Sequence, residues 1–123
     1  MEGASNEFNE LNELSELGVV VESEEGEHFL PSSVALRVVP MPELTVVPGA
    51  PRQVLGAALY EGDVVLVLAA GSATSDCLIC RMDDSLIGLG GVRVVRSGVP
   101  QQALPRFDLR GFVELAANSR KMA

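Results

Sequence analysis

Two cysteines three positions apart, Cys77 and Cys80, are the residues whose types and spacing most directly suggest chemistry. A C-x-x-C pair forms a redox or zinc site when both sulfurs lie on one side of the backbone, as at a helix start or in a knuckle turn. Here the flanking residues, CLICRM, are typical of a strand, in which residues three apart point to opposite faces. The sequence contains no second cysteine pair. We therefore expect two buried structural cysteines, and a small redox or metal protein using this pair is the alternative.

One histidine and a cluster of glycines are the next candidates. His28 is the only histidine of the chain, and beside a predicted strand we expect a surface or core residue, not a catalyst or ligand. Gly88, Gly90 and Gly91 are not followed by the lysine of a phosphate-binding loop. We expect these glycines to allow bulges or sharp bends in strands.

Two acidic pairs, Asp83 with Asp84 and Glu61 with Asp63, supply fewer oxygen ligands than a calcium loop requires. Both lie at predicted hairpin tips, where Asp and Gly are expected for backbone reasons. The sequence therefore predicts no catalytic residue, no metal site and no cofactor.

The composition and spacing predict that short strands separated by turns position the functional residues of the chain. Apolar residues make up 47% of the 123 residues but aromatic residues only 4%, so the core must consist of Val, Leu, Ile and Ala, a composition that favours strands. The expected strands are residues 19–21, 28–30, 36–39, 45–47, 54–60, 64–68, 77–82, 86–89, 92–95 and 112–115. Their spacing is typical of a barrel or a sandwich. The core residues that we expect are Val38, Val54, Leu55, Val65, Val67, Leu78, Leu86, Leu89, Val92 and Val94.

The N-terminal segment differs from the rest of the chain. Residues 1–27 contain nine acidic and no basic residues, whereas the remaining chain is nearly neutral. Residues 7–17 carry apolar side chains three apart and predict a short helix, which either packs on its own domain or mediates self-association. We expect three parts: an acidic tail with this helix at 1–18, a β domain at 19–116 and a loose tail at 117–123.

Charge and hydropathy exclude several classes of protein. An acidic tail on a neutral body repels nucleic acid and anionic membrane. The N-terminus is acidic and lacks the apolar run of a signal peptide, and the longest apolar stretch is far too short to insert into a membrane. We expect a cytoplasmic protein with reduced thiols that binds no nucleic acid.

Four segments between residues 29 and 115 are similar to the motifs of a known family. Residues 42–56, PELTVVPGAPRQVLG, are similar to "PELTPVPGAPxxVxG", and residues 59–67, LYEGDVVLV, are similar to "NLRGxVVPV". Residues 77–95 resemble the hairpin "VVExxGxxxGLxVDxV", and residues 108–111, DLRG, resemble "YIRG". Through these segments the chain resembles the CheW-like family of chemotaxis coupling proteins.

This resemblance implies an all-β fold of two small SH3-like β-barrel subdomains. It also implies a non-enzymatic adaptor of two-component signalling and motility, which bridges the cytoplasmic tip of a chemoreceptor (methyl-accepting protein) and the regulatory domain of a CheA-type histidine kinase. Another CheW-like adaptor is a further expected partner. The partner-binding residues that we expect are Arg37, Val46, Val54, Leu59, Tyr60, Glu61 and Gly62.

The sequence also departs from the family pattern. Glu61 stands where the family has Arg, Arg37 falls where it often has Glu in a "VxEV" segment, and Gly91 replaces its usual Asp. The chain also lacks the family's last apolar strand and short helix, so we expect a truncated second barrel. These changes predict a divergent modulator that keeps only part of the receptor–adaptor–kinase contacts, with an ordinary coupling protein as the alternative.

Overall fold

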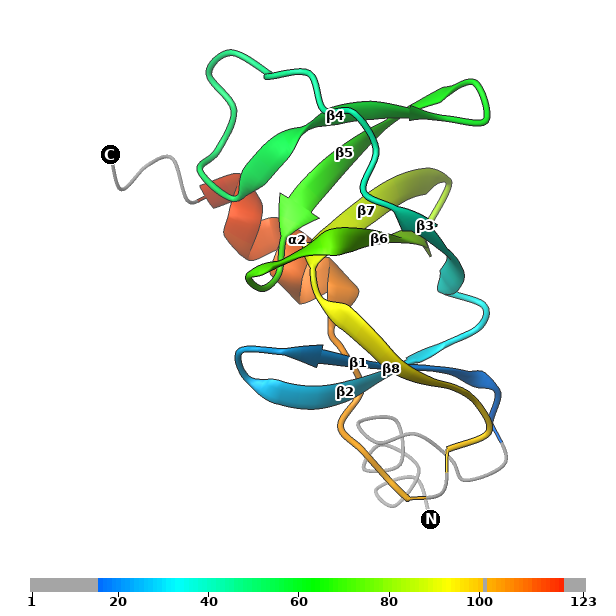
Figure 1. Ribbon diagram of the computed structural model, residues 1–123. Helices are drawn as coiled ribbons and strands as arrows, with labels where there is room; N and C mark the ends of the chain where they lie inside the picture. The colour runs from blue at the N-terminus through cyan, green and yellow to red at the C-terminus, as the bar shows by residue number, and fades with distance from the viewer. Residues whose placement is uncertain (1–15, 101, 119–123) are drawn as a thin grey trace.

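The structure, a computed structural model, describes residues 16–100 and 102–118 (Figure 1). This part of the chain comprises eight strands followed by one helix. The elements are β1 (Gly18–Ser23), β2 (Gly26–Pro31), β3 (Ala35–Pro40), β4 (Val54–Tyr60), β5 (Asp63–Ala69), β6 (Ala73–Met82), β7 (Ser85–Gly91), β8 (Arg93–Gly98) and α2 (Leu109–Asn118). The predicted all-β class is therefore confirmed, and the hairpin turns at Glu61-Gly62 and Asp83-Asp84 lie where the sequence predicts them.

The strands form two sheets that meet along one buried layer. A three-stranded sheet has the order β2-β1-β8, and a five-stranded sheet has the order β3-β6-β7-β5-β4. All neighbouring strands are antiparallel except β5 and β7. In Figure 1 the three-stranded sheet lies below the five-stranded sheet, and β7 continues directly into β8 between them.

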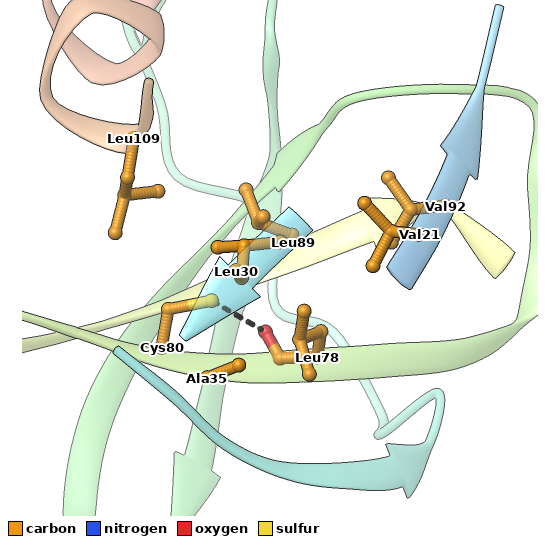
Figure 2. Packing of buried hydrophobic residues seen from close by; sticks show 8 residues of the cluster. All are labelled: Val21, Leu30, Ala35, Leu78, Cys80, Leu89, Val92 and Leu109. Carbon is orange, nitrogen blue, oxygen red and sulfur yellow. Dashed lines mark hydrogen bonds between the residues drawn. The ribbon is translucent and has the colours of Figure 1, made fainter. Parts of the chain in front are cut away.

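Three apolar clusters fill the interior of the described part of the chain, and the smallest consists of Leu68, Ile87 and Ala116. The first, here called the shared core, lies between the sheets (Figure 2) and consists of Val21, Leu30, Ala35, Leu78, Cys80, Leu89, Val92 and Leu109. The second core lies on the other side of β6 and consists of Ala58, Val67, Cys77 and Ile79. β6 therefore buries side chains on both of its faces.

Most predicted core residues lie in these clusters or against them. Val65, Val67, Leu78, Leu89 and Val92 are buried, and Val54, Leu86 and Val94 are half-buried. Val38 and Leu55, in contrast, are exposed, so those two predictions are wrong. Both residues lie close to β-bulges, which shift the register at 35–37 and at 54–56. A one-residue shift turns a side chain to the opposite face.

The predicted strand at residues 112–115 is also wrong, because this segment belongs to α2. Leu109, Phe112, Val113 and Ala116 recur at helical spacing and all pack against the apolar clusters. The carboxylate of Asp108 accepts a hydrogen bond of 3.0 Å from the Gly111 N–H and caps the helix.

Two other predicted elements need comment. The strand expected at residues 45–47 is reduced to one bridge between Thr45 and Ala57, since prolines at 42 and 48 bracket it and cannot donate to a ladder. The helix expected at residues 7–17 lies almost wholly outside the described residues. The division at 1–18, 19–116 and 117–123 stays a prediction.

Gly91 controls the passage of the chain from one sheet to the other. It ends β7 with φ of 85°, and its backbone lies directly against that of Gly71. A Cβ atom on either glycine would overlap the backbone of the other. No side chain, the expected Asp of the resembled pattern included, therefore fits at position 91 in this fold.

We predict that Gly91→Ala destabilises the protein much more than Gly98→Ala. Both glycines have positive φ, but a Cβ at Gly98 meets nothing within 4 Å. Gly98→Ala therefore carries only the backbone cost, about 1 kcal/mol, whereas Gly91→Ala adds roughly 1–3 kcal/mol of overpacking. Urea unfolding of the two variants measures the difference, and equal losses would contradict the proposed backbone contact.

Candidate functional site

The turn between β4 and β5 presents a charged residue in an uncommon backbone conformation. Tyr60 pairs with Asp63, and the two turn residues, Glu61 and Gly62, have φ of 50° and 88°. Two consecutive positive φ angles suit the twist of a two-residue hairpin. Glycine adopts such angles readily, but glutamate rarely does. The turn therefore holds the Glu61 carboxylate at the tip of the hairpin.

Arg37 on β3 reaches across to this tip. Its Nη1 atom donates a hydrogen bond to Glu61 Oε2 at 3.2 Å and lies 3.5 Å from the Tyr60 hydroxyl oxygen. The hydrogen bond to Tyr60 and the charge of Glu61 raise the pKa of Arg37, so its guanidinium stays charged. The two charged side chains are 60% and 65% exposed. Three of the predicted site residues therefore meet in one solvent-accessible group.

Tyr60 anchors this group to the protein interior. Its ring packs against the second core, while its hydroxyl reaches the guanidinium at the surface. An aromatic ring with one apolar and one polar end suits such a position. The second core thus determines where the ion pair lies.

The contact between Arg37 and Glu61 changes how their charges act. Taken one at a time from the sequence, each is a charge reversal relative to the family, and Glu61 alone is expected to repel an acidic partner. In the structure the two reversals form one ion pair. The pair has no net charge, so Glu61 is not an isolated acidic charge at this tip.

The outer face of the same hairpin carries apolar side chains. Leu59 and Val64 are opposite each other across the strands and are 73% and 71% exposed. Leu66 is exposed next to them, and we call these three residues the hairpin patch. A hollow of about 460 Å³ beside the patch is lined by Pro42, Glu43, Thr45, Ala57, Ala58, Leu59 and Val64. Clustered exposed apolar residues of this kind indicate a binding surface.

The remaining predicted site residues lie in different surroundings. Val46 is 79% exposed and follows Thr45, which borders the hollow. Val54 is half-buried at the far end of β4, against a small cluster that contains Leu68 and Ile87. The structure therefore places Leu59, Tyr60, Glu61 and Gly62 at the tip of the β4–β5 hairpin and brings Arg37 of β3 against Tyr60 and Glu61. Val54 lies at the other end of β4, away from this tip.

Sequence reasoning missed Val64 and Leu66 as surface residues. Val65 and Val67 are correctly expected in the core, but their neighbours were not considered as part of a binding surface because residues 64–68 are all apolar. The length of the turn could have identified them. A two-residue loop at 61–62 places Val64 opposite Leu59, which was already a predicted binding residue.

The two cysteines do not form a joint site. Cys77 packs in the second core and Cys80 in the shared core, on opposite faces of β6, as the strand pattern predicts. The Cys80 thiol donates a hydrogen bond to the Leu78 carbonyl oxygen at 3.8 Å (Figure 2). Burial raises the pKa of Cys77 to about 11 and, together with the charge of Cys77, that of Cys80 to about 12. These thiols therefore stay protonated, which disfavours a thiolate nucleophile or metal ligand.

His28 also lies away from the hairpin. Its ring meets Phe107 edge-on with centroids 6.1 Å apart, and its Nδ1 atom is buried without a hydrogen-bond partner in the described part of the chain. Nothing in residues 16–100 and 102–118 groups three or more metal-ligating side chains.

Comparison with known proteins finds a likeness to a solved structure. No protein-family model and no curated protein matches the chain. Among solved structures, the chain resembles the scaffolding protein TtCheW from Thermoanaerobacter tengcongensis with a TM-score of 0.55 and 17% sequence identity. The match covers 80% of this chain but 66% of that protein, so the chain spans slightly less than two thirds of its length. This likeness supports a CheW-like fold. No described helix is long and apolar enough to cross a membrane.

We predict that the buried cysteines make the protein sensitive to alkaline pH. Both thiol pKa values are higher in the folded protein than the ordinary value of 9.0, so the unfolded chain loses these protons first as the pH rises. Stability is therefore complete below about pH 9 and falls on the way to the folded pKa values, by roughly 1.4 kcal/mol per pH unit for each thiol.

Urea unfolding between about pH 8 and about pH 10.5 measures this loss. The Cys77→Ala/Cys80→Ala variant is the control, because it lacks the two protons and must show a shallower decline. Identical slopes for the two proteins would contradict the raised pKa values.

We also predict that breaking the Arg37–Glu61 pair leaves stability nearly unchanged, because exposed ion pairs contribute little. Arg37→Gln should unfold at the same urea concentration as the unmodified protein within error. Arg106→Gln is the contrasting variant, since Arg106 pairs with Glu16 in a mostly buried position and lies over the Phe29 ring. A loss for Arg37→Gln as large as that for Arg106→Gln would show that the exposed pair is structural.

Proposed function

We propose that this chain is a non-enzymatic adaptor of a bacterial chemosensory pathway. The observation that carries the proposal is the Arg37–Tyr60–Glu61 group beside the hairpin patch, at the end of a segment that resembles the family most closely. The CheW-like fold supports the proposal, and so does the burial of both thiols on opposite faces of β6. The protein acts by holding partners together and not by chemical transformation.

The partners that we propose are the cytoplasmic tip of a chemoreceptor and the regulatory domain of a CheA-type histidine kinase, or another CheW-like adaptor. Leu59 and Val64 supply exposed apolar area for the contact, which is the main source of affinity in such interfaces. The neighbouring charges of Arg37 and Glu61 select the partner and its orientation.

The finer form of the proposal is a modulator that does not complete the receptor–kinase bridge. The reversed charges favour it, because a surface that matches one partner rejects another of opposite charge pattern. A divergent adaptor similar to FrzB of gliding-motility chemosensory systems fits this description. An ordinary coupling protein is the second candidate, since the ion pair leaves the site without net charge.

Self-association through residues 7–17 is a different class of function. Deletion of these residues, followed by a measurement of mass in solution, separates it from the adaptor. An adaptor keeps its binding to receptor or kinase after the deletion, whereas an oligomerisation module loses its assembled mass.

We predict that Leu59→Ser weakens binding to the receptor tip or the kinase regulatory domain by roughly tenfold or more, because it removes an apolar contact at the centre of the patch. Leu115→Ser on α2 is the matched control, since Leu59 and Leu115 are both 73% exposed. Both changes should leave the stability within about 0.5 kcal/mol of the unmodified protein.

Calorimetric titration with each partner fragment separately measures these affinities, and a kinase-activation assay follows. Equal effects of Leu59→Ser and Leu115→Ser would remove the hairpin patch from the interface. Strong binding to both partners with full kinase activation would replace the modulator with an ordinary coupling protein.

A further inference from the structure

We infer that a hollow between α2 and the β1–β2 turn is a binding site for a short cationic segment, and that the chain's own residues 119–123, SRKMA, occupy it. No residue lines both this hollow and the one beside the hairpin patch. The contact replaces the loose tail expected from the sequence. It does not depend on the proposed adaptor function, because it involves this chain alone.

The α2 hollow, as we call it, has a volume of about 550 Å³ and one apolar wall. Phe107 and Phe112 line it, with ring centroids 5.6 Å apart, and the lining residue Leu115 is 73% exposed. Residues 111, 112, 115 and 118 all line the hollow and share one face of the helix. The hollow therefore extends along α2 to its last residue.

Carboxylates surround this apolar wall. Glu25, Asp108 and Glu114 line the hollow, and its lining arginine, Arg106, is engaged by Glu16 in a mostly buried ion pair. Glu25 and Glu114 form no ion pair within residues 16–100 and 102–118. Unpaired carboxylates in a concave site attract cations, and aromatic rings beside them add cation–π attraction. The α2 hollow is therefore suited to a lysine or arginine side chain.

The basic residues of the chain indicate which segment fits. Five of the nine form ion pairs in the described part of the chain, namely Arg37, Arg93, Arg96, Arg106 and Arg110. Arg52 and Arg81 do not line the hollow. The other two, Arg120 and Lys121, are adjacent and are followed by Met122. This segment thus combines two cations for the carboxylates with one apolar side chain for the wall.

The chain also reaches the α2 hollow at a suitable place. Asn118 is both the last residue of α2 and a lining residue. Five extended residues span at most about 17 Å, and a helix of 10 residues is about 15 Å long. Residues 119–123 can therefore return along α2 within the hollow. Exposed ion pairs are weak individually, but a segment tethered beside its site has an effective concentration in roughly the millimolar range.

The first test attaches a nitroxide spin label to the full chain at Ala123→Cys and records the amide NMR signals of the β1–β2 turn. The buried thiols of Cys77 and Cys80 stay protonated, so the label reacts at residue 123. The reference is the same sample after chemical reduction of the nitroxide.

Two charge variants of the labelled chain are compared. Glu25→Gln/Glu114→Gln removes two carboxylates that line the hollow. Glu43→Gln/Asp84→Asn is the matched control, because it removes two exposed acidic charges that do not line it. Unchanged signals of β3 to β7 show that each variant keeps the fold.

The signals of Ser23 and His28 should weaken roughly twofold or more in the labelled chain, because the tethered segment occupies the hollow most of the time. Glu25→Gln/Glu114→Gln should restore most of this intensity, whereas the control variant should not. Salt at about 1 M should restore it as well, since it screens exposed charges.

A second measurement tests the class of ligand. An acetylated peptide with the sequence SRKMA is titrated into the full chain carrying Arg120→Gln/Lys121→Gln, whose own segment lacks the cations. The amide signals of Ser23 and His28 should shift. The same titration of the unmodified chain should give smaller shifts, because its own segment competes with the peptide.

Other results would overturn the inference. Equal weakening in the unmodified chain and in Glu25→Gln/Glu114→Gln, or at low and high salt, would show that the segment does not occupy the hollow. Absence of any shift with the peptide would show that the hollow does not recognise cations. Weakening caused by the spin label of a second, mixed-in copy would assign the hollow to the segment of another molecule. Neither measurement includes a receptor or kinase fragment, so a failure here leaves the adaptor proposal standing.

Discussion

The structure depends on one strand that buries both of its faces. Leu78 and Cys80 of β6 point into the shared core, whereas Cys77 and Ile79 point into the second core. A strand of this kind separates two apolar clusters. Its sequence must therefore be apolar at successive positions and not only at alternate ones. The two cysteines obey the same constraint, because each is a small apolar residue that packs on its own face of β6.

The packing of the two sheets, the β7–β8 connection and the position of Tyr60 all depend on this doubly buried strand. Since the shared core contains residues from both sheets as well as Leu109 of α2, the two sheets and the start of the helix are one packed unit. Close approach of the backbones at Gly71 and Gly91 then lets the chain leave β7 and enter β8 without a loop. The ring of Tyr60 packs against the second core, and its hydroxyl oxygen accepts a hydrogen bond from the guanidinium of Arg37. A buried apolar contact thus sets the position of an exposed polar one.

This division of roles separates the charged ends of Arg37 and Glu61 from the contacts that hold the fold together. The apolar contacts that position β3, β4 and β5 do not involve the charged ends of Arg37 or Glu61, which are largely in water. The fold therefore places little constraint on the charge at either position. Binding specificity can diverge at such a site while the scaffold stays constant.

The sequence by itself determined most of the strands, the hairpin tips and the opposite facing of Cys77 and Cys80. β-branched runs, turn residues and the two-residue period of a strand are local properties. It did not reveal the helix at Leu109–Asn118: its apolar residues 112 and 113 also suit a strand, and helical spacing becomes decisive only against Leu68, Ile87 and the shared core. The exposure of Val38 and Leu55 depended on bulges that the pairing with neighbouring strands creates. The ion pair between Arg37 and Glu61 likewise depends on the tertiary structure alone. They are 24 residues apart, Arg37 on β3 and Glu61 in the turn between β4 and β5, so only the folded sheet brings them into one pair.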